Sequence, residues 1–350
     1  MRLGFAQAIR KGTNHEGDLC AYCCTGRTAW GCGVARFLFW RVVQAVVVIF
    51  VVTVVVFFLL HQIPGGPARG ILGIQATEDQ IQAFEHEQGF DQPVPIQYLH
   101  YLGRLLQGDL GESFQLNQSV ADLIGQRLPK TLVLTVLSTL VALLVAIPLG
   151  VWQAVRRNRP TDYLLSALTL LIYSTPVFLV GFVFIIVFAI NAAWFPVEAP
   201  QADTLGGIFA DSQALVLPVL TGAGVVLAVF SRYLRSSVVD NLDEDYVRTA
   251  RAKGASETRI VTRHVLKNSL TSLVAMLGYY LPVLFSGALV TEKLFNYPGM
   301  GLLFWNAAQT SDFPILLGVV LVISLATVTG SLLADVAQAL IDPRTRRVKA

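Results

Sequence analysis

Charged side chains are scarce in this chain of 350 residues. They make up 14% of it, whereas 54% of the residues are hydrophobic and the mean hydropathy is +0.60. An ordinary soluble domain carries about 25% charged residues, because it has to cover its core with a polar surface. The composition therefore excludes a soluble enzyme and predicts a protein that spans a membrane.

Cysteine is absent from every part of the chain except its N-terminal tail. The four residues are Cys20, Cys23, Cys24 and Cys32. We expect this tail to lie on the reducing side of the membrane, so no disulfide framework is predicted. The spacing permits a Zn²⁺ site built from thiolates, but only His15 lies close by and no second spaced pair follows. A disordered or accessory tail is the alternative that we favour.

Reactive motifs are missing as well. The chain has no G-x-x-x-x-G-K-[ST] phosphate loop, no H-E-x-x-H pair and no evident nucleophile with its base. A membrane-embedded enzyme is disfavoured for this reason. If the protein moves a solute uphill, the energy has to come from a partner.

Six apolar runs, free of charged residues except for Asp335 in the last one, are close to the roughly 20 residues that a helix needs to cross a bilayer. The third run is long and contains Pro176, and the fourth is short and contains Pro218. The runs extend approximately from Val42 to Leu60, Leu132 to Val151, Tyr163 to Ala193, Leu215 to Phe230, Leu273 to Val290 and Ile315 to Ile341.

Titratable side chains are nearly absent from these runs. Carriers driven by a proton or ion gradient usually bury such groups in their spans, so the sequence argues against ion coupling. Asp335 is the exception, and it lies near the inner end of the last run. We expect it to snorkel to the surface or to pair with the Arg-rich C-terminal tail.

The orientation follows from Lys and Arg, which are enriched in cytoplasmic loops. With a cytoplasmic N-terminus, 21 of the 26 basic residues lie inside and 13 of the 23 acidic residues lie outside. Both termini are therefore predicted to be cytoplasmic.

The outer segment 61–130 separates the first two runs. Its apolar spacing predicts two short helices joined by the turn Gly108 to Gly111. A docking surface for an external partner and a lid on the helix bundle are equally compatible with this pattern. The two apolar faces consist of Tyr98, Leu99, Leu102, Leu105 and Leu106, and of Val120, Leu123, Ile124 and Leu128.

The cytoplasmic segment 232–273 carries the most informative pattern. Asn241 or Asp243 is expected to cap a helix that begins with acidic residues, ends with basic ones and stops at Gly254. Small residues near its end form a slim surface suited to a groove on another protein, and a second helix begins at Ser256. The alternative is a basic loop that only marks the topology.

Five motifs follow one another along the chain: PGGPA (64–68), GDLGESF (108–114) with RLPKTL (127–132), DYVRTARAKGAS (245–256), FNYPGMG (295–301) and IDPRTR (341–346). In this order they resemble the permeases of ATP-binding-cassette (ABC) importers, in the dipeptide and oligopeptide (peptide/nickel) permease family. The segment from Asp245 to Ser256 resembles the coupling-helix motif of that family. Arg248 stands where an acidic residue is frequent, and Leu266-Lys267 replaces a Leu-Pro pair.

The resemblance implies an all-α polytopic fold with six transmembrane helices, the ABC importer type I permease fold, in a prokaryotic cytoplasmic membrane. It implies a second permease, two cytoplasmic ATPase subunits that bind ATP and Mg²⁺, and an external substrate-binding lipoprotein. No cofactor in this chain, no enzymatic activity and no nucleic acid are expected; membrane lipid surrounds the spans.

The same resemblance assigns two groups of site residues. The contact with the ATPase comprises Asp245, Tyr246, Arg248, Thr249, Ala250, Arg251, Ala252, Lys253, Gly254 and Ala255. The loops that face the receptor comprise Gly108, Asp109, Leu110, Gly111, Phe114, Tyr297, Pro298 and Gly299.

We therefore divide the chain into a cytoplasmic extension (1–35), a transmembrane domain (36–346) and a cytoplasmic tail (347–350). The predicted function is import of di- and oligopeptides as half of a translocation path. Nickel chelates, glutathione or another small solute are alternatives within the same architecture, and an autonomous channel or facilitator is the alternative from another class.

Overall fold

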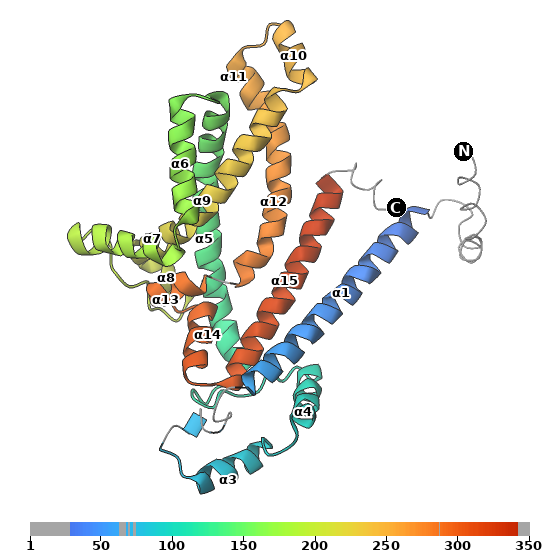
Figure 1. The fold of residues 1–350 in the computed structure, drawn as a ribbon, viewed down its shortest axis with the longest axis vertical. Coiled ribbons are helices and arrows are strands. Elements are labelled where there is room, and N and C mark those ends of the chain that lie inside the picture. Colours follow the sequence, from blue (N-terminus) through green and yellow to red (C-terminus); the bar gives the residue numbers. More distant parts are fainter. Residues whose placement is uncertain (1–28, 63–67, 69–70, 73–74, 287, 342–350) are drawn as a thin grey trace, which may run out of the picture.

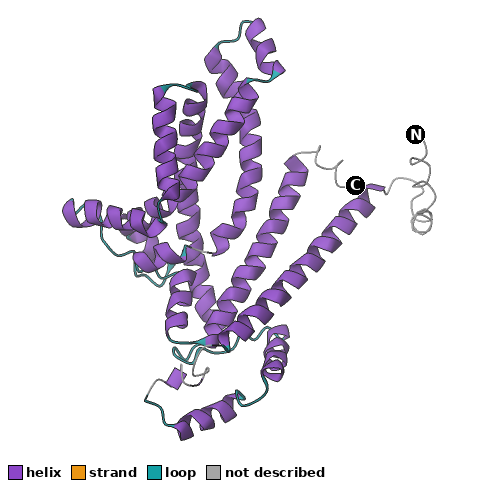
Figure 2. Cartoon of the chain, viewed as in Figure 1, coloured by secondary structure: helices purple, strands orange, loops and turns teal. Residues whose placement is uncertain are grey.

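The computed structural model describes residues 29–62, 68, 71–72, 75–286 and 288–341. Their regular structure is helical, apart from an isolated bridge between Glu112 and Ser119 (Figure 2). The larger elements are α1 (Ala29–Leu60), α3 (Glu78–Gln88), α4 (Val94–Leu106), α5 (Val120–Val155), α6 (Pro160–Ser174), α7 (Val177–Phe184), the π-helix η1 (Ile185–Asn191), α8 (Leu205–Ala210), α9 (Ser212–Leu242), α10 (Asp245–Ala252), α11 (Glu257–Arg259), the π-helix η2 (Ile260–Val265), α12 (Leu266–Ser286), α13 (Leu289–Leu294), α14 (Met300–Gln309) and α15 (Phe313–Ile341).

Four of these helices are long and apolar enough to cross a membrane: Phe39–Leu60 of α1, α5, α9 and Phe313–Asp335 of α15. The bent pair α6 with α7 and η1 makes a fifth if it counts as one span. The remaining predicted run falls on α12, which is helical but is not among these candidates in the described residues. The multi-pass architecture is thus confirmed, whereas the number of six spans stays a prediction.

The third predicted run is not one straight helix. Its two halves meet at an angle of 104°. Pro176 precedes α7 in an extended conformation, and Thr175 before it is extended as well. Proline has no N–H for the helical ladder and disfavours a helical conformation in the preceding residue, so the helix breaks here.

The core of the bundle is the contact between α5 and α9. Gly150 of α5 lies so close to α9 that an added Cβ would sit 2.9 Å from the carbonyl oxygen of Ser231 and 3.3 Å from the amide nitrogen of Arg235. Buried alanines of α5 pack on Phe230 and Leu234 of α9, both fully buried. The two backbones are therefore in direct contact near Ser231 and Arg235 of α9.

Helix α1 stands apart from this core and packs mainly along α15 (Figure 1). An ion pair joins Arg41 of α1 to Asp335 of α15. Asp335 was expected to snorkel or to pair with the C-terminal tail, and its partner in the described residues is instead Arg41 of the first span, because α1 packs along α15.

The outer segment contains the predicted helix at 98–106 as α4, but its buried face differs from the expected one. Tyr98 and Tyr101 are buried against Phe57 of α1, whereas Leu99 is 63% and Leu106 82% exposed. Aromatic rings bury more area than leucines, and these two tyrosines face a ring on α1.

The second predicted short helix does not exist as a separate element. Val120, Leu123 and Ile124 are buried as expected, but they form the first turns of the long helix α5. Helices α3 and α4 lie at one end of the molecule, and α10 and α11 lie at the opposite end (Figure 1). Helices α3 and α4 of the outer segment are therefore separated from α10 and α11 by the length of the bundle.

Candidate functional site

The coupling segment, residues 243–259, projects beyond the end of α9. Helix α9 continues to Leu242, so Asn241 is a helical residue rather than a cap, and α10 begins at Asp245 after Glu244. The predicted cap at Asn241 or Asp243 is therefore wrong. Local hydrogen bonds within α9 extended the helix past the point that the capping pattern indicated.

The coupling segment is anchored by its own inward side chains. Val247 is fully buried in a cluster with residues of α9, η2 and α12, and Tyr246, Ala250 and Ala255 pack against that cluster. The Tyr246 hydroxyl donates to Oδ1 of Asn241 over 2.9 Å. Two of the small residues predicted to enter a partner's groove, Ala250 and Ala255, thus face this chain.

The remaining predicted contact residues are exposed. Gly254 ends the helix as predicted, with φ of +78°, and the amide of Ala255 donates back to the carbonyl of Ala250 over 3.1 Å. This is the left-handed helix ending that glycine favours. The exposed residues are Asp245, Arg248, Thr249, Arg251, Ala252, Lys253 and Gly254.

Two ion pairs on the exposed side, Arg248 with Asp245 and Arg251 with Glu257, lie within the segment. Arg251 donates to both carboxylate oxygens of Glu257 over 2.7 and 3.1 Å, and this hydrogen bonding lowers the pKa of Glu257. The Ser256 side chain accepts from the amide of Arg259 and begins α11 where the sequence predicted a helix start. The segment is therefore a preformed unit with a defined outer surface.

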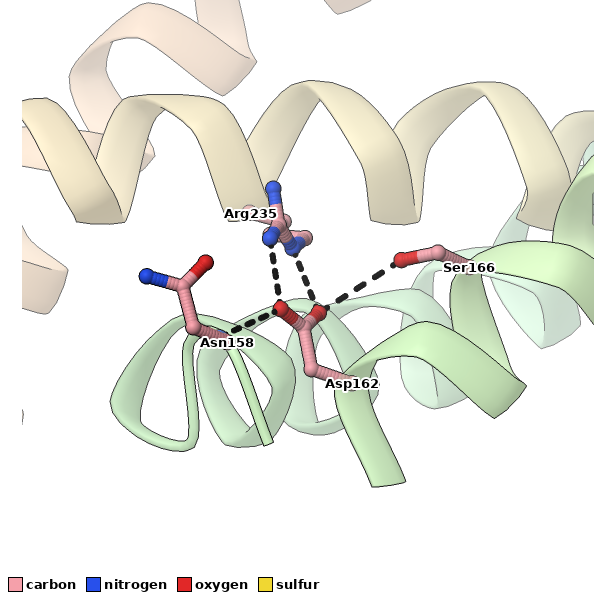
Figure 3. Close-up of polar contacts among 4 residues, drawn as sticks. All are labelled: Asn158, Asp162, Ser166 and Arg235. Carbon is pink, nitrogen blue, oxygen red and sulfur yellow. Dashed lines mark hydrogen bonds and ion pairs between the residues drawn. The ribbon is translucent and has the colours of Figure 1, made fainter. Parts of the chain in front are cut away.

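A buried ion pair lies beside the coupling segment, and sequence reasoning missed it. Asp162 of α6 is 1% exposed and accepts from Nε and Nη2 of Arg235 of α9 over 2.7 and 2.6 Å (Figure 3). The amide of Asn158 and the hydroxyl of Ser166 also donate to this carboxylate. Both charges flank apolar runs, so their only sequence signal was a place at a span end.

At the opposite end, the GDLGESF loop is tied to the start of α15. Asp312 is fully buried; it accepts from the Ser113 hydroxyl over 2.6 Å and from the amide of Gln115 over 3.3 Å. Gly108 and Gly111 have φ of +80° and +83°, as the predicted turn requires.

The predicted receptor-facing residues of this loop divide into two groups. Gly108 and Asp109 are exposed, and Gly111 is half-buried. Leu110 packs on the cluster around α14 and α15, and Phe114 packs against Phe84 and Phe90. Of these five predicted residues, Gly108 and Asp109 are thus the most exposed.

The FNYPGMG loop is built around a second buried carboxylate, Glu292 of α13. This fully buried side chain accepts from the Thr131 hydroxyl over 2.7 Å and from the amides of Gly301 and Leu302 over 2.7 and 3.0 Å. Burial raises the pKa of Glu292, and these hydrogen bonds oppose the rise. The carboxylate therefore caps the N-terminus of α14.

The three residues of this loop that were predicted to face a receptor are buried. The Tyr297 hydroxyl donates to the carbonyl of Lys130 over 2.7 Å, and the carbonyl of Pro298 accepts from Arg127. A Cβ on Gly299 would collide with the Glu292 carboxylate. In this structure Tyr297, Pro298 and Gly299 hold the loop in shape, and the exposed residues beside them are Lys293 and Asn296.

The candidate zinc ligands Cys20, Cys23 and Cys24 lie outside the described residues, as do most of the PGGPA and IDPRTR motifs. Cys32 falls in α1, which begins at Ala29, inside the predicted extension 1–35. Among the described residues, no group of three or more His, Cys, Asp or Glu side chains is placed to hold a metal ion.

Comparison with known proteins identifies two matching family descriptions. "Binding-protein-dependent transport system inner membrane component" matches residues 146–347, and the N-terminal part of such membrane components matches residues 34–135. The match thus covers both the core helices and the coupling segment.

Individual relatives are similar over nearly their whole length. A putative peptide permease protein of Brucella ovis is 36% identical over 89% of this chain and 99% of its own length. The glutathione transport system permease protein GsiC of Escherichia coli is 39% identical over 87% of this chain and 97% of its own. A chain of the MetNI methionine ABC transporter in an inward-facing conformation has a TM-score of 0.49 at 17% identity, over 63% of this chain and 96% of that one.

Proposed function

This chain belongs to the family of binding-protein-dependent transport system inner membrane components, and from that premise we propose that it is one permease subunit of an ATP-driven importer of short peptides. As an inner-membrane permease it is a transport component, and the family implies separate ATPase subunits. We place both termini in the cytoplasm and pair the chain with a second permease and an external binding lipoprotein.

The observation that carries this proposal is the coupling segment. It lies at the end of the bundle opposite the outer segment, and its core residue Val247 fixes it to α9, η2 and α12. Its exposed surface ends in the small residues Ala252 and Gly254. A slim, rigidly mounted helix end suits a groove on an ATPase subunit, which moves the helix when the ATPases close.

The proposed contact with the ATPase is tested by a substitution that adds a bulky side chain to the coupling segment, where it would clash with the groove of the ATPase subunit but not with this chain. Ala252 is exposed, so Ala252→Trp should leave the permease folded but prevent the ATPase subunits from copurifying and abolish import by proteoliposomes. Thr262→Trp places the same side chain at an exposed position on η2, outside the coupling segment, and serves as the matched control. Normal copurification and import by Ala252→Trp would contradict the proposal.

The facilitator alternative predicts a different result. A channel or facilitator would carry solute after purification of this chain alone, without ATP. We expect no uptake of labelled tripeptides, including glutathione, by vesicles that contain only this permease.

The proposed substrate class is short peptides, with glutathione as a member of it. The relatives named peptide permease and glutathione transport permease support this class. We assign the choice of peptide mainly to the external receptor, because the predicted spans offer almost no charged groups to bind peptide termini. Mass spectrometry of the molecule held by the copurified receptor tests the class; tight peptide binding by the isolated permease would contradict the assignment.

A further inference from the structure

Helix α6 is attached to the bundle through very few buried side chains. Along its 15 residues only Asp162 and Thr169 are buried. Its apolar residues Leu164, Leu168 and Leu171 are between 50% and 69% exposed. Asp162 is therefore the main attachment of α6 at its cytoplasmic end.

The partner of Asp162 lies on the helix that carries the coupling segment. Arg235 precedes the end of α9 by about two turns, and α10 follows after two residues. Tyr246 and Val247 bind α10 to the end of α9. A displacement of α10 thus reaches Arg235 through packed structure rather than through a flexible linker.

Helices α6 and α7 form an arm, and the end of this arm away from Asp162 contacts the outer loop 292–301. Beyond the 104° bend, α7 carries Gly181, which packs directly against Leu294 at the end of α13. A Cβ at Gly181 would also lie 3.5 Å from the ring of Phe295 and 3.3 Å from Thr221 of α9. The arm of α6 and α7 therefore runs from Arg235 to the loop that surrounds Glu292.

We propose that the Asp162–Arg235 ion pair is the joint through which movement of the coupling segment is passed to the arm of α6 and α7 and on to the outer loop 292–301. This inference rests on the proposed function. Asp162 and Arg235 are positioning residues in this scheme, because they act through the helices that they join. A bidentate contact fixes the orientation of two helices as well as their distance, which an apolar contact does not.

A neighbouring ion pair provides an internal control. Arg157, just before α6, contacts Asp243, just after α9, over 3.2 Å through one nitrogen, and the two side chains are 49% and 72% exposed. It joins nearly the same two segments as the buried pair. Because an exposed single contact fixes little, Arg157→Gln should leave transmission intact.

The test measures transmission directly in the complete transporter, reconstituted with its ATPases and second permease. In a background with Cys20, Cys23, Cys24 and Cys32 replaced by serine, Lys293→Cys places a reporter on the exposed side of α13. Its labelling rate with a membrane-impermeant maleimide is compared between the nucleotide-free and ATP–vanadate states, per assembled complex. With the pair intact we expect the two rates to differ by about fivefold or more.

Two variants break the joint in different ways. Asp162→Asn keeps the side-chain size but loses the charge. Arg235→Lys keeps the charge but loses the two parallel N–H donors of the guanidinium. Both variants should retain the ATPase subunits and ATP hydrolysis, while the ratio of the labelling rates in the two nucleotide states falls close to one. The conservative variant Asp162→Glu should keep part of the difference between the two rates. A normal ratio per assembled complex in either variant, including one that accumulates poorly, overturns the inference.

The same experiment separates this inference from the proposed function. If the ATPases do not copurify with the intact permease, or if the reporter ignores ATP while the pair is intact, the proposed function fails and the inference with it. If the labelling rate of the parent changes with ATP and the rates of the two variants change by the same factor, only the role of the ion pair as a joint is refuted.

Discussion

The two ends of the bundle each contain a buried carboxylate, but the two groups are held differently. At the end that carries the coupling segment, named the inner end after its predicted side, Asp162 faces the guanidinium of Arg235 and is charge-balanced. At the outer end, Glu292 is held by a hydroxyl and two backbone amides at the start of α14. The inner contact joins residues 73 positions apart on two helices, whereas the outer carboxylate holds the start of the next helix, α14, and ties it to Thr131 of α5.

This difference indicates how each end responds to the loss of a hydrogen-bond or ion-pair partner. Without Arg235, the buried Asp162 keeps only the neutral donors Asn158 and Ser166 and has no counter-charge, so the inner site fails as a pair. The outer site distributes one carboxylate over several neutral donors, and each of them contributes a part. The inner end is therefore suited to fixing one helix against another, and the outer end to keeping a loop in one conformation.

The largest effect is expected when one partner of the inner pair is removed. Arg235→Leu leaves Asp162 buried without its counter-charge and should lower the free energy of unfolding by about 3 kcal/mol, near the lower limit for buried pairs because Arg235 is partly exposed. Thermal unfolding of the purified protein in detergent measures this. The double variant Asp162→Leu/Arg235→Leu should recover most of the loss; equal instability of both would show that the pair is not what Arg235 stabilises.

The outer site should be less sensitive. In Glu292→Gln the single carbonyl oxygen can still accept from the Gly301 and Leu302 amides, but without a negative charge, and an NH2 group replaces the oxygen that accepts from the Thr131 hydroxyl. We expect this loss to cost about 1–3 kcal/mol. The same unfolding assay measures it, and protease cleavage within 295–301 reports loosening of the loop. A loss as large as that of Arg235→Leu would remove the contrast between the two ends.

The pH response of the outer site has a defined sign. Burial raises the folded-state pKa of Glu292 above its unfolded value, so the group stabilises the fold at low pH and this contribution is lost as the pH rises through the folded value. Relative to Glu292→Gln, the wild type should gain free energy of unfolding on acidification, by at most about 1.4 kcal/mol per pH unit between the folded-state and the unfolded-state pKa of Glu292. A gain on raising the pH instead would show that the hydrogen bonds outweigh burial.

The smallest effect is expected from the exposed pair at the inner end. Arg157→Gln should change the free energy of unfolding by less than about 0.5 kcal/mol, because solvent and salt screen the contact with Asp243. Addition of salt should leave the difference between wild type and variant nearly unchanged. A loss comparable to that of Arg235→Leu would show that burial is not what separates the two ion pairs.

The sequence allowed prediction of features that depend on neighbours in the chain. The apolar runs located the long helices, Gly254 was predicted to end α10, and Ser256 was predicted to start α11. The turn at Gly108 to Gly111 was also predicted correctly. Local hydrogen bonding and hydrophobic length decide all of these.

Features that depend on contacts between distant helices were missed. Nothing near Asp162 in the sequence indicates Arg235, and Arg41 was not recognised as the partner of Asp335. The burial of Tyr297 depends on the Lys130 carbonyl of α5, so the motif alone suggested an exposed loop. The bend at Pro176 was noted as an irregularity, but its angle is set by packing of α7 on α9 and α13.

The pairing of α1 with α15 has a consequence for biosynthesis. Helix α1 is synthesised before its main helical neighbour, α15, and its apolar window is only 11% buried with a mean hydropathy of 3.1. Such a segment is hydrophobic enough to partition into lipid without help. We therefore expect α1 to enter the bilayer as an independent anchor and to pack against α15, through Arg41 and Asp335, only after α15 has been made.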